Sequence, residues 1–240
     1  MRCGSEEDMK QSHVPPCISR RSLLAGLVGV GGTWLASTLI GRAADRDCPI
    51  TPPQTEGPYY PPKAQIDAML DQDNDLTRLK GQSGKATGPL VYVLGQVRDR
   101  QCRPIEGAVV EIWQASENGR YSHPRDRDNR APLDPNFQYW GKSVTDKEGR
   151  YLFKTIKPGS YQAGRNWTRP PHIHFKVSYA TFRPFITQMY FAGDAYQATD
   201  YILNDVPTDQ RARVIVQLES PGADYEPEAR LGRFDLTLLK

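Results

Sequence analysis

The chain has 240 residues, of which 38% are hydrophobic and 25% are charged, and it contains 20 glycines and 20 prolines. This much proline argues against a helical bundle, and glycine and proline without a repeat do not indicate collagen or a disordered chain. A formal net charge of +3 is too small to indicate a nucleic-acid partner. The length suits one large domain or two small ones.

Residues 1–44 differ from the rest of the chain. A pair of arginines, Arg20 and Arg21, precedes an uncharged, glycine-rich run over 22–41, and small residues follow at 43–44. A basic region, an apolar region and small residues before a polar continuation predict a secretory signal peptide, here of the twin-arginine type. We therefore expect an exported protein, periplasmic or secreted. The alternative is an uncleaved membrane anchor, because the run is long enough to span a bilayer.

Removing residues 1–44 changes the charge and the cysteine content. The remaining chain carries 26 basic and 25 acidic residues, so its net charge falls to +1. We expect no nucleic-acid partner, and contact with a membrane only through the signal segment if that segment stays uncleaved. Cys48 and Cys102 become the only pair of cysteines. In an oxidising compartment they favour a disulfide, and two buried free thiols are the alternative.

The remaining chain begins with an extended arm and continues as short strands. Prolines are frequent over 48–62, which favours extended backbone, and 64–80 has room for a short helix, so the arm is expected over 45–88. Strand-like runs then occupy 90–98, 107–115, 142–146, 150–156, 172–179, 185–191, 213–218 and 232–239. Only 207–213 favours helix, with proline at its start. This spacing predicts an all-β domain over 89–240, a single antiparallel β-sandwich with few short helices.

Two histidines stand two residues apart in one predicted strand. The strand period places Ile173, Phe175 and Val177 on one face, toward the core, and His172 and His174 on the other. Neutral imidazole is a common ligand of first-row metals, so the pair indicates a metal site. By itself the pattern is weak, because surface strands also contain such pairs by chance.

Further motifs surround the histidine pair. They are 55–60 (TEGPYY), 107–115 (GAVVEIWQA), 118–121 (NGRY), 131–137 (APLDPNF), 155–161 (TIKPGSY), 169–175 (RPPHIHF) and 187–194 (TQMYFAGD). On these motifs the chain resembles the intradiol ring-cleavage dioxygenases, and within them the iron-binding (beta) subunits of protocatechuate 3,4-dioxygenases. The segment 145–161 alone is also similar to a hairpin of non-catalytic binding modules. The residues that discriminate between the two are Tyr121, Tyr161, Arg169, His172 and His174.

The resemblance implies one ferric ion per chain, with Tyr121, Tyr161, His172 and His174 as its ligands. Two tyrosinates and a hydroxide balance the charge of Fe(III) and leave both imidazoles neutral, while ionising a phenol with a pKa near 10 needs a strong Lewis acid beside it. The resemblance also implies that O₂ cleaves a catechol-type ring between its two hydroxylated carbons, giving a cis,cis-muconate-type product. In the family, the catechol displaces the ligand that matches Tyr161, so we expect Tyr161 to act as a base.

The resemblance assigns roles to three more residues. Arg169 is expected over the bound ring, where it stabilises developing negative charge, and a surface or salt-bridging arginine is the alternative. Gln188 matches a pocket residue that hydrogen-bonds the substrate, and Tyr59 lies where the arm of related proteins reaches it. An ordinary strand glutamine and a packed aromatic are the alternatives. Trp113 is expected in the core, and His123 in a loop without a metal role.

The chain also departs from the family pattern. The loop over 162–168 is shorter than expected and has Ala163 at the position of an aromatic pocket residue, which predicts a wider ring pocket or one lined by Trp167. No residue is a secure partner for a ring substituent, so the sequence does not identify which substituted catechol is the substrate. It also leaves open whether the chain forms a homo-oligomer or a hetero-oligomer. The alternative functions are an exported module that binds aromatics or glycans without turnover, and a copper or zinc enzyme.

Overall fold

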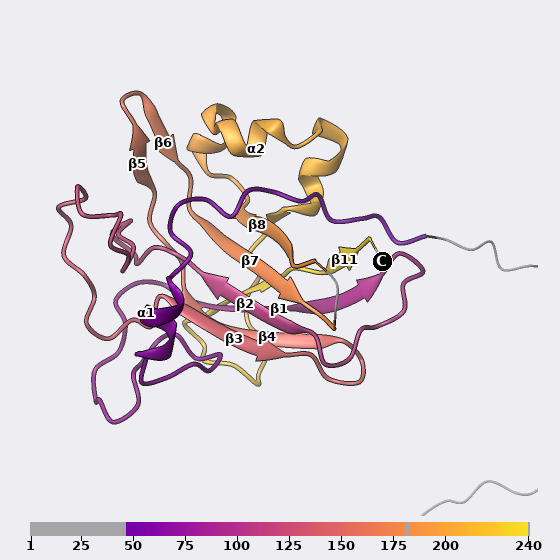
Figure 1. Ribbon diagram of the computed structural model, residues 1–240, viewed down its shortest axis with the longest axis horizontal. Coiled ribbons are helices and arrows are strands. Elements are labelled where there is room, and N and C mark those ends of the chain that lie inside the picture. Colours follow the sequence, from indigo (N-terminus) through magenta and orange to yellow (C-terminus); the bar gives the residue numbers. More distant parts are fainter. Residues whose placement is uncertain (1–46, 181–182, 240) are drawn as a thin grey trace, which may run out of the picture. The chain divides into compact units, whose positions relative to one another are not determined.

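The computed structural model describes residues 47–180 and 183–239, which Figure 1 draws in colour. They belong to one of the two compact units of the chain, Arg42–Lys240. The predicted signal peptide over 1–44 lies outside the described residues. Among the residues that are described, no helix has both the length and the apolar character needed to cross a bilayer.

Four strands form the first sheet, around the long strand β1 (Leu90–Asp99). β4 (Arg150–Ile156) lies antiparallel to β1, while β10 (Arg230–Arg233) and β11 (Leu236–Leu238) lie parallel to it. Along β1 fully buried residues alternate with half-buried ones. This alternation follows from the strand period of two when one face packs against a core.

Five strands form the second sheet. Their order is β3 (Trp140–Val144), β2 (Val109–Trp113), β7 (His172–Ser178), β8 (Phe185–Phe191) and β9 (Ile215–Val216). All neighbours are antiparallel except β8 and β9. β7 is the central strand: its residues 174–177 pair with β2 on one side and with β8 on the other, whereas His172 pairs with β8 alone.

The two sheets pack face to face on one core of aliphatic and aromatic side chains. Phe175 of β7 contacts rings from the opposite sheet and its edge, with centroid distances of 6.5 Å to Phe153 and 4.9 Å to Phe234. The predicted β-sandwich is therefore confirmed. Three of its strand pairs, β1–β10, β1–β11 and β8–β9, are parallel where the sequence predicted antiparallel ones. Hydrophobic alternation fixes which face of a strand is buried but carries no information on the direction of its partner.

The helices are few and short, as predicted, but their bounds differ. The short helix expected within 64–80 is α1, which covers Lys63–Asp67. Beyond it, side chains such as Asp73 and Asp75 accept backbone N–H groups in turns. The segment expected as a helix over 207–213 is a 3₁₀ helix, η2 (Thr208–Arg213). Two further short helices, η1 (Ala195–Thr199) and α2 (Tyr201–Asp205), were not predicted.

A small hairpin stands where the sequence analysis placed a loop. β5 (Tyr161–Gly164) pairs with β6 (Trp167–Arg169) and projects beside η1 and α2 (Figure 1). Its register sets Tyr161 directly opposite Arg169. The hairpin therefore brings together two residues that the sequence analysis had assigned to the same site.

The arm crosses the second sheet as an extended segment (Figure 1). It begins near the first sheet, where Thr51 N–H donates to the Thr237 carbonyl at 3.0 Å, and continues to β8, where Gln54 N–H donates to the Ile186 carbonyl at 2.9 Å. A disulfide joins Cys48 to Cys102, in the turn after β1. The start of the arm is thus fixed covalently to the sandwich.

Loss of this disulfide should lower the free energy of unfolding. The bond closes a loop with a sequence separation of 54 residues, and a disulfide of this kind typically contributes about 2–4 kcal/mol by restricting the unfolded chain. We expect Cys48→Ser, Cys102→Ser and the double variant to unfold at the same lower denaturant concentration. Chemical denaturation checks this. Equal midpoints for the double variant and the oxidised native chain would contradict it.

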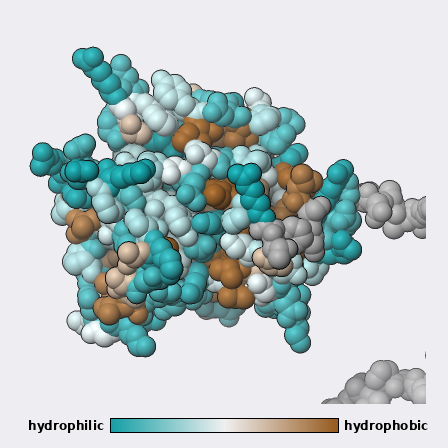
Figure 2. Space-filling model, viewed as in Figure 1, coloured by the Kyte–Doolittle hydropathy of each residue, from teal (hydrophilic) through white to brown (hydrophobic). Residues whose placement is uncertain are grey.

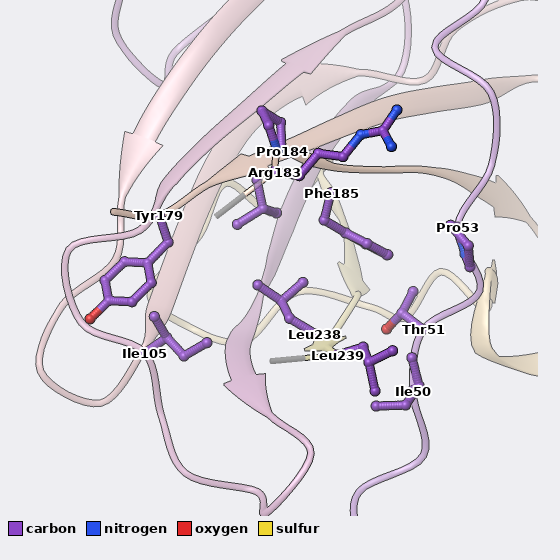
Figure 3. A pocket seen from close by; sticks show the side chains of 11 residues that line it. Ile50, Thr51, Pro53, Ile105, Tyr179, Arg183, Pro184, Phe185, Leu238 and Leu239 are labelled. Carbon is purple, nitrogen blue, oxygen red and sulfur yellow. The ribbon is translucent and has the colours of Figure 1, made fainter. Parts of the chain in front are cut away.

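Apolar residues on the face shown in Figure 2 form small separate patches among hydrophilic ones. An apolar cavity of about 240 Å³ lies where the arm leaves the first sheet (Figure 3). Ile50, Phe185 and Leu238 are among the side chains that line it, with Arg183 beside them. None of the predicted site residues contributes to this lining, so the cavity is separate from the candidate site described next.

Candidate metal centre

Both histidines of β7 are buried on the face of the second sheet that points away from the shared core. On β2, Trp113 lies opposite His174, and the two rings stack at 4.7 Å with an interplanar angle of 11°. Trp113 belongs to a second aromatic cluster that also contains Tyr121 and Tyr161. Trp113 is thus buried in a core cluster, as expected, and its ring also supports the imidazole of His174.

The nitrogen and oxygen atoms of three predicted ligands converge. His172 Nε2 lies 3.2 Å from His174 Nε2 and 3.3 Å from the phenol oxygen of Tyr121. His172 Nδ1 lies 2.7 Å from the Pro170 carbonyl, which as an acceptor fixes the proton on Nδ1 and turns the lone pair of Nε2 toward the other two atoms. This is the arrangement expected of a histidine that is prepared to bind a metal.

Two adjoining turns deliver the tyrosines to this point. Tyr121 follows the turn at Gly119, and Tyr161 follows the turn at Ser160 and opens β5. Gly119 has a φ of +80°, and a Cβ there would lie 2.2 Å from the Ser160 carbonyl oxygen, so only glycine lets the two turns touch. The Tyr121 and Tyr161 rings meet edge to face with centroids 5.5 Å apart, and the Tyr161 ring lies 5.8 Å from that of His172.

Burial sets the protonation of these four side chains. Desolvation, with the positive charge of Arg169 nearby, holds the pKa of His172 and His174 well below the usual range, so both imidazoles are neutral. Burial also raises the pKa of Tyr121 and Tyr161, and Arg169 offsets part of this at Tyr161 through its charge and a hydrogen bond. The protein alone therefore keeps both phenols protonated. A strong Lewis acid is needed to ionise them.

Arg169 lies beside the centre, in a buried ion pair. Its Nε donates to Asp200 Oδ1 at 2.9 Å, and its Nη2 donates to Gln188 Oε1 at 2.8 Å and to the Tyr190 hydroxyl at 3.1 Å. The salt-bridging alternative is thus present, and the register of β5 and β6 also sets Arg169 opposite Tyr161. The position of Arg169 over a bound ring stays a prediction. The side-chain amide of Gln188 also donates to the Thr55 carbonyl at 2.9 Å, so its observed contacts support Arg169 and the arm. Its contact with a substrate stays a prediction.

Tyr59 brings the arm over the tyrosines. Its ring stacks on Tyr121 at 4.5 Å and meets Tyr161 edge to face at 6.0 Å. Burial, followed by the carboxylate of Asp126, raises the pKa of Tyr59 to about 12, so it is a neutral hydrogen-bond donor near neutral pH. The ring of His123 lies 5.8 Å from Tyr59, at the border of the site. The arm therefore forms one wall of the centre.

Four residues of the site escaped the sequence analysis. Asp200 and Tyr190 contact Arg169, Gln54 accepts a hydrogen bond from the Tyr190 hydroxyl at 2.9 Å, and Asp126 accepts the Tyr121 N–H at 2.7 Å. Tyr190 could have been assigned to the site from the sequence, because it stands two residues after Gln188 on the same face of a predicted strand. The others depend on tertiary contacts that no local pattern reveals.

The donor set fits a ferric ion better than zinc or copper. Within 47–180 and 183–239, no three His, Cys, Asp or Glu side chains are grouped so that they would hold a metal ion. The candidate centre instead joins two neutral imidazoles to two buried phenols. Hard phenolate oxygens match the hard, highly charged Fe(III), and as anions they balance two of its charges.

Comparison with known proteins identifies the family. The sequence pattern of the family described as Dioxygenase matches residues 55–238, and that range contains every candidate site residue named above except Gln54. The chain belongs to the intradiol ring-cleavage dioxygenases. Over 182 residues it is 42% identical to the protocatechuate 3,4-dioxygenase beta chain of Burkholderia cepacia, covering 75% of this chain and 77% of that one.

Solved structures of intradiol dioxygenases share the fold. The dioxygenase domain of a carbohydrate-binding fusion protein from Streptomyces sp. SirexAA-E is 26% identical, with a TM-score of 0.56 over 80% of this chain and 99% of that domain. Catechol 1,2-dioxygenase from Pseudomonas arvilla C-1 is also 26% identical, with a TM-score of 0.57. That match covers 79% of this chain but only 62% of the relative. The sandwich is thus the part that the chain shares with longer intradiol dioxygenases.

Proposed function

We propose that the chain binds one ferric ion through Tyr121, Tyr161, His172 and His174 and cleaves a catechol-type ring between its hydroxylated carbons with O₂. The product is of the cis,cis-muconate type. The observation that carries the proposal is that His174 Nε2 and the Tyr121 hydroxyl both lie within 3.3 Å of His172 Nε2, with the Tyr161 ring beside that of Tyr121. A module that binds aromatics without turnover has no need for such a cluster.

The residues around the centre have distinct tasks. When bound, the ferric ion supplies the Lewis acidity that ionises phenols and activates a catechol toward O₂. The Pro170 carbonyl holds the His172 tautomer, and Trp113 holds the ring of His174. Tyr161 is the less buried of the two tyrosines, and its phenolate oxygen takes the proton from one substrate hydroxyl.

Arg169 and the arm act on the substrate side. The Arg169 guanidinium lies next to Tyr161 and stabilises the negative charge that develops on the ring during cleavage. The Tyr59 ring covers the centre beside Tyr121 and keeps water out. Trp167 lies close to Arg169, whose Cζ is 5.7 Å from the indole centroid, and it forms a pocket wall in place of the missing aromatic at Ala163.

Oxygen uptake tests the reaction. We expect the purified protein to be coloured, to contain about one iron per chain and to consume O₂ with at least one of catechol, protocatechuate and hydroxyquinol. A colourless preparation that stays inactive on all three after iron reconstitution would refute the proposal. Binding of a catechol without O₂ uptake by the iron-loaded protein would favour the binding module instead.

We also propose that the twin-arginine segment exports the protein to the periplasm or the medium, where it meets catechols outside the cytoplasm. The support is the Arg20–Arg21 pair before the uncharged run over 22–41. The double variant Arg20→Lys, Arg21→Lys should retain the protein in the cytoplasmic fraction. Equal export of this variant and the native chain would exclude the twin-arginine route.

A further inference from the structure

The Asp200 carboxylate is the most heavily bonded acid near the centre. It is 0% exposed and receives hydrogen bonds from three different residues. Arg169 donates Nε to Oδ1 at 2.9 Å and Nη2 to Oδ2 at 3.2 Å, Trp167 donates Nε1 to Oδ1 at 3.0 Å, and the Leu203 N–H donates to Oδ2 at 3.1 Å. Each carboxylate oxygen thus accepts two hydrogen bonds.

These bonds fix the orientation of Arg169. The two parallel N–H···O bonds from Nε and Nη2 form a bidentate pair, which sets the plane of the guanidinium as well as its position. Both partners are buried, with Arg169 only 2% exposed, so separating them would leave a buried charge without a partner, which is strongly unfavourable. Gln188 Oε1 and the Tyr190 hydroxyl hold Nη2 from another side.

The same carboxylate also fixes Trp167. The indole Nε1 bonds to the oxygen that accepts Arg169 Nε, and the indole ring packs on Tyr201 with centroids 5.1 Å apart. Trp167 and Arg169 are the two ends of β6, and Asp200 is the residue before α2. One acid therefore ties the hairpin that carries Arg169 to the helix that flanks it.

We propose that Asp200 is a positioning residue for ring cleavage, which holds the guanidinium of Arg169 in one plane beside Tyr161 and keeps Trp167 against it. The inference rests on the proposed function, in which Arg169 stabilises charge on the reacting ring. A carboxylate that only capped α2 would need a single bond, from the Leu203 N–H, and would not need to face Arg169.

The variant Asp200→Asn tests this. Asparagine retains an oxygen that can accept from Leu203 or Trp167, but it loses the charge and the bidentate pair. We expect kcat to fall by about 100-fold, because a displacement of about 1 Å at a group that acts on the reaction has that effect. Iron content and the visible spectrum of the resting protein should stay unchanged, since Asp200 is not among the four ligands.

Two further variants separate positioning from folding. Asp194→Asn is the matched control, because Asp194 caps η1 through the Tyr196 N–H at 2.9 Å and does not bond to Arg169, so its kcat should equal that of the native chain. Arg169→Lys keeps the buried positive charge but cannot form the bidentate pair, so its kcat should fall at least about tenfold. This second variant decides the matter even if Asp200→Asn does not fold.

A double-variant comparison gives the last discriminating result. In an Arg169→Gln background, Asp200→Asn should lower kcat no further, because Asp200 acts through Arg169. A kcat for Asp200→Asn or Arg169→Lys within twofold of the native value would overturn the inference, as would an equal loss in the Arg169→Gln background. In either case an active native enzyme would leave the proposed function standing. An inactive, iron-free native protein would overturn both.

Discussion

The variant His172→Ala should lose iron binding and ring cleavage together. His172 Nε2 lies between two other donors, 3.2 Å from His174 Nε2 and 3.3 Å from the Tyr121 hydroxyl, so its removal opens the middle of the site. Losing only a hydrogen-bond partner of a metal ligand typically weakens metal binding by about 10- to 100-fold. We therefore expect more than a 100-fold loss of iron affinity, measured by metal analysis and by titration of the visible absorption.

The matched control for this change is His123→Ala. His123 approaches Tyr59, but its ring makes no contact with the two imidazoles of β7, and its alanine variant should bind iron as the native chain does. The expectation fails if His172→Ala retains native iron content and colour. It also fails if both alanine variants lose iron to the same extent, since the effect would then not be specific to His172.

The variant Tyr161→Phe should keep its iron but change colour and slow turnover. Three of the four ligands remain, so the metal stays bound, while loss of one phenolate alters the charge-transfer absorption. Tyr161 is also the proposed base for a substrate hydroxyl, and loss of a general base typically lowers a rate by 10²- to 10⁴-fold. We expect kcat to fall by about 100-fold or more, measured by O₂ uptake at saturating substrate.

Tyr225→Phe provides the comparison for this experiment. The ring of Tyr225 packs against that of Tyr92, with centroids 4.6 Å apart. Tyr92 lies on β1 in the first sheet, whereas the two histidines lie on β7 in the second. Removing the Tyr225 hydroxyl should therefore change neither the absorption spectrum nor kcat. An absorption spectrum of Tyr161→Phe that matches the native one would exclude Tyr161 as a ligand. A normal rate with an altered spectrum would instead exclude it as the base.

The candidate ligands and Arg169 could be predicted because they occur in short contiguous motifs. The segment 169–175 carries Arg169, His172 and His174 together. The histidine pair by itself is only a weak indication of a metal site, and the family resemblance assigned the ligands and the role of Arg169. Asp200 could not be predicted, because its contact with Arg169 joins positions 31 residues apart across a hairpin and a helix. The hydrogen bond between Gln54 and Tyr190 joins residues that are 136 positions apart, so it was even less accessible to local sequence patterns. Such contacts depend on which segments the tertiary fold brings together.

In the fold, too, features marked by a local sequence pattern could be predicted, whereas those without one could not. β4 and β8 were predicted with their observed bounds. Burial alternates along β4, as in a strand with one buried face, whereas β8 is buried continuously over its last five residues and was marked by its β-branched and aromatic residues. The β5–β6 hairpin was missed because its tip over 162–166 is polar and exposed, with no alternation to reveal it. The parallel edge strands β9, β10 and β11 are too short for a pattern to fix their partners.

The long-range contacts of the arm bear on the order in which the centre folds. The Thr237 N–H donates to the Thr51 hydroxyl, although the two residues are 186 positions apart in the sequence. Long-range pairing of this kind forms slowly and only after both partners exist. Some of the contacts that hold the arm, and with it the wall that Tyr59 provides, can therefore form only late in folding.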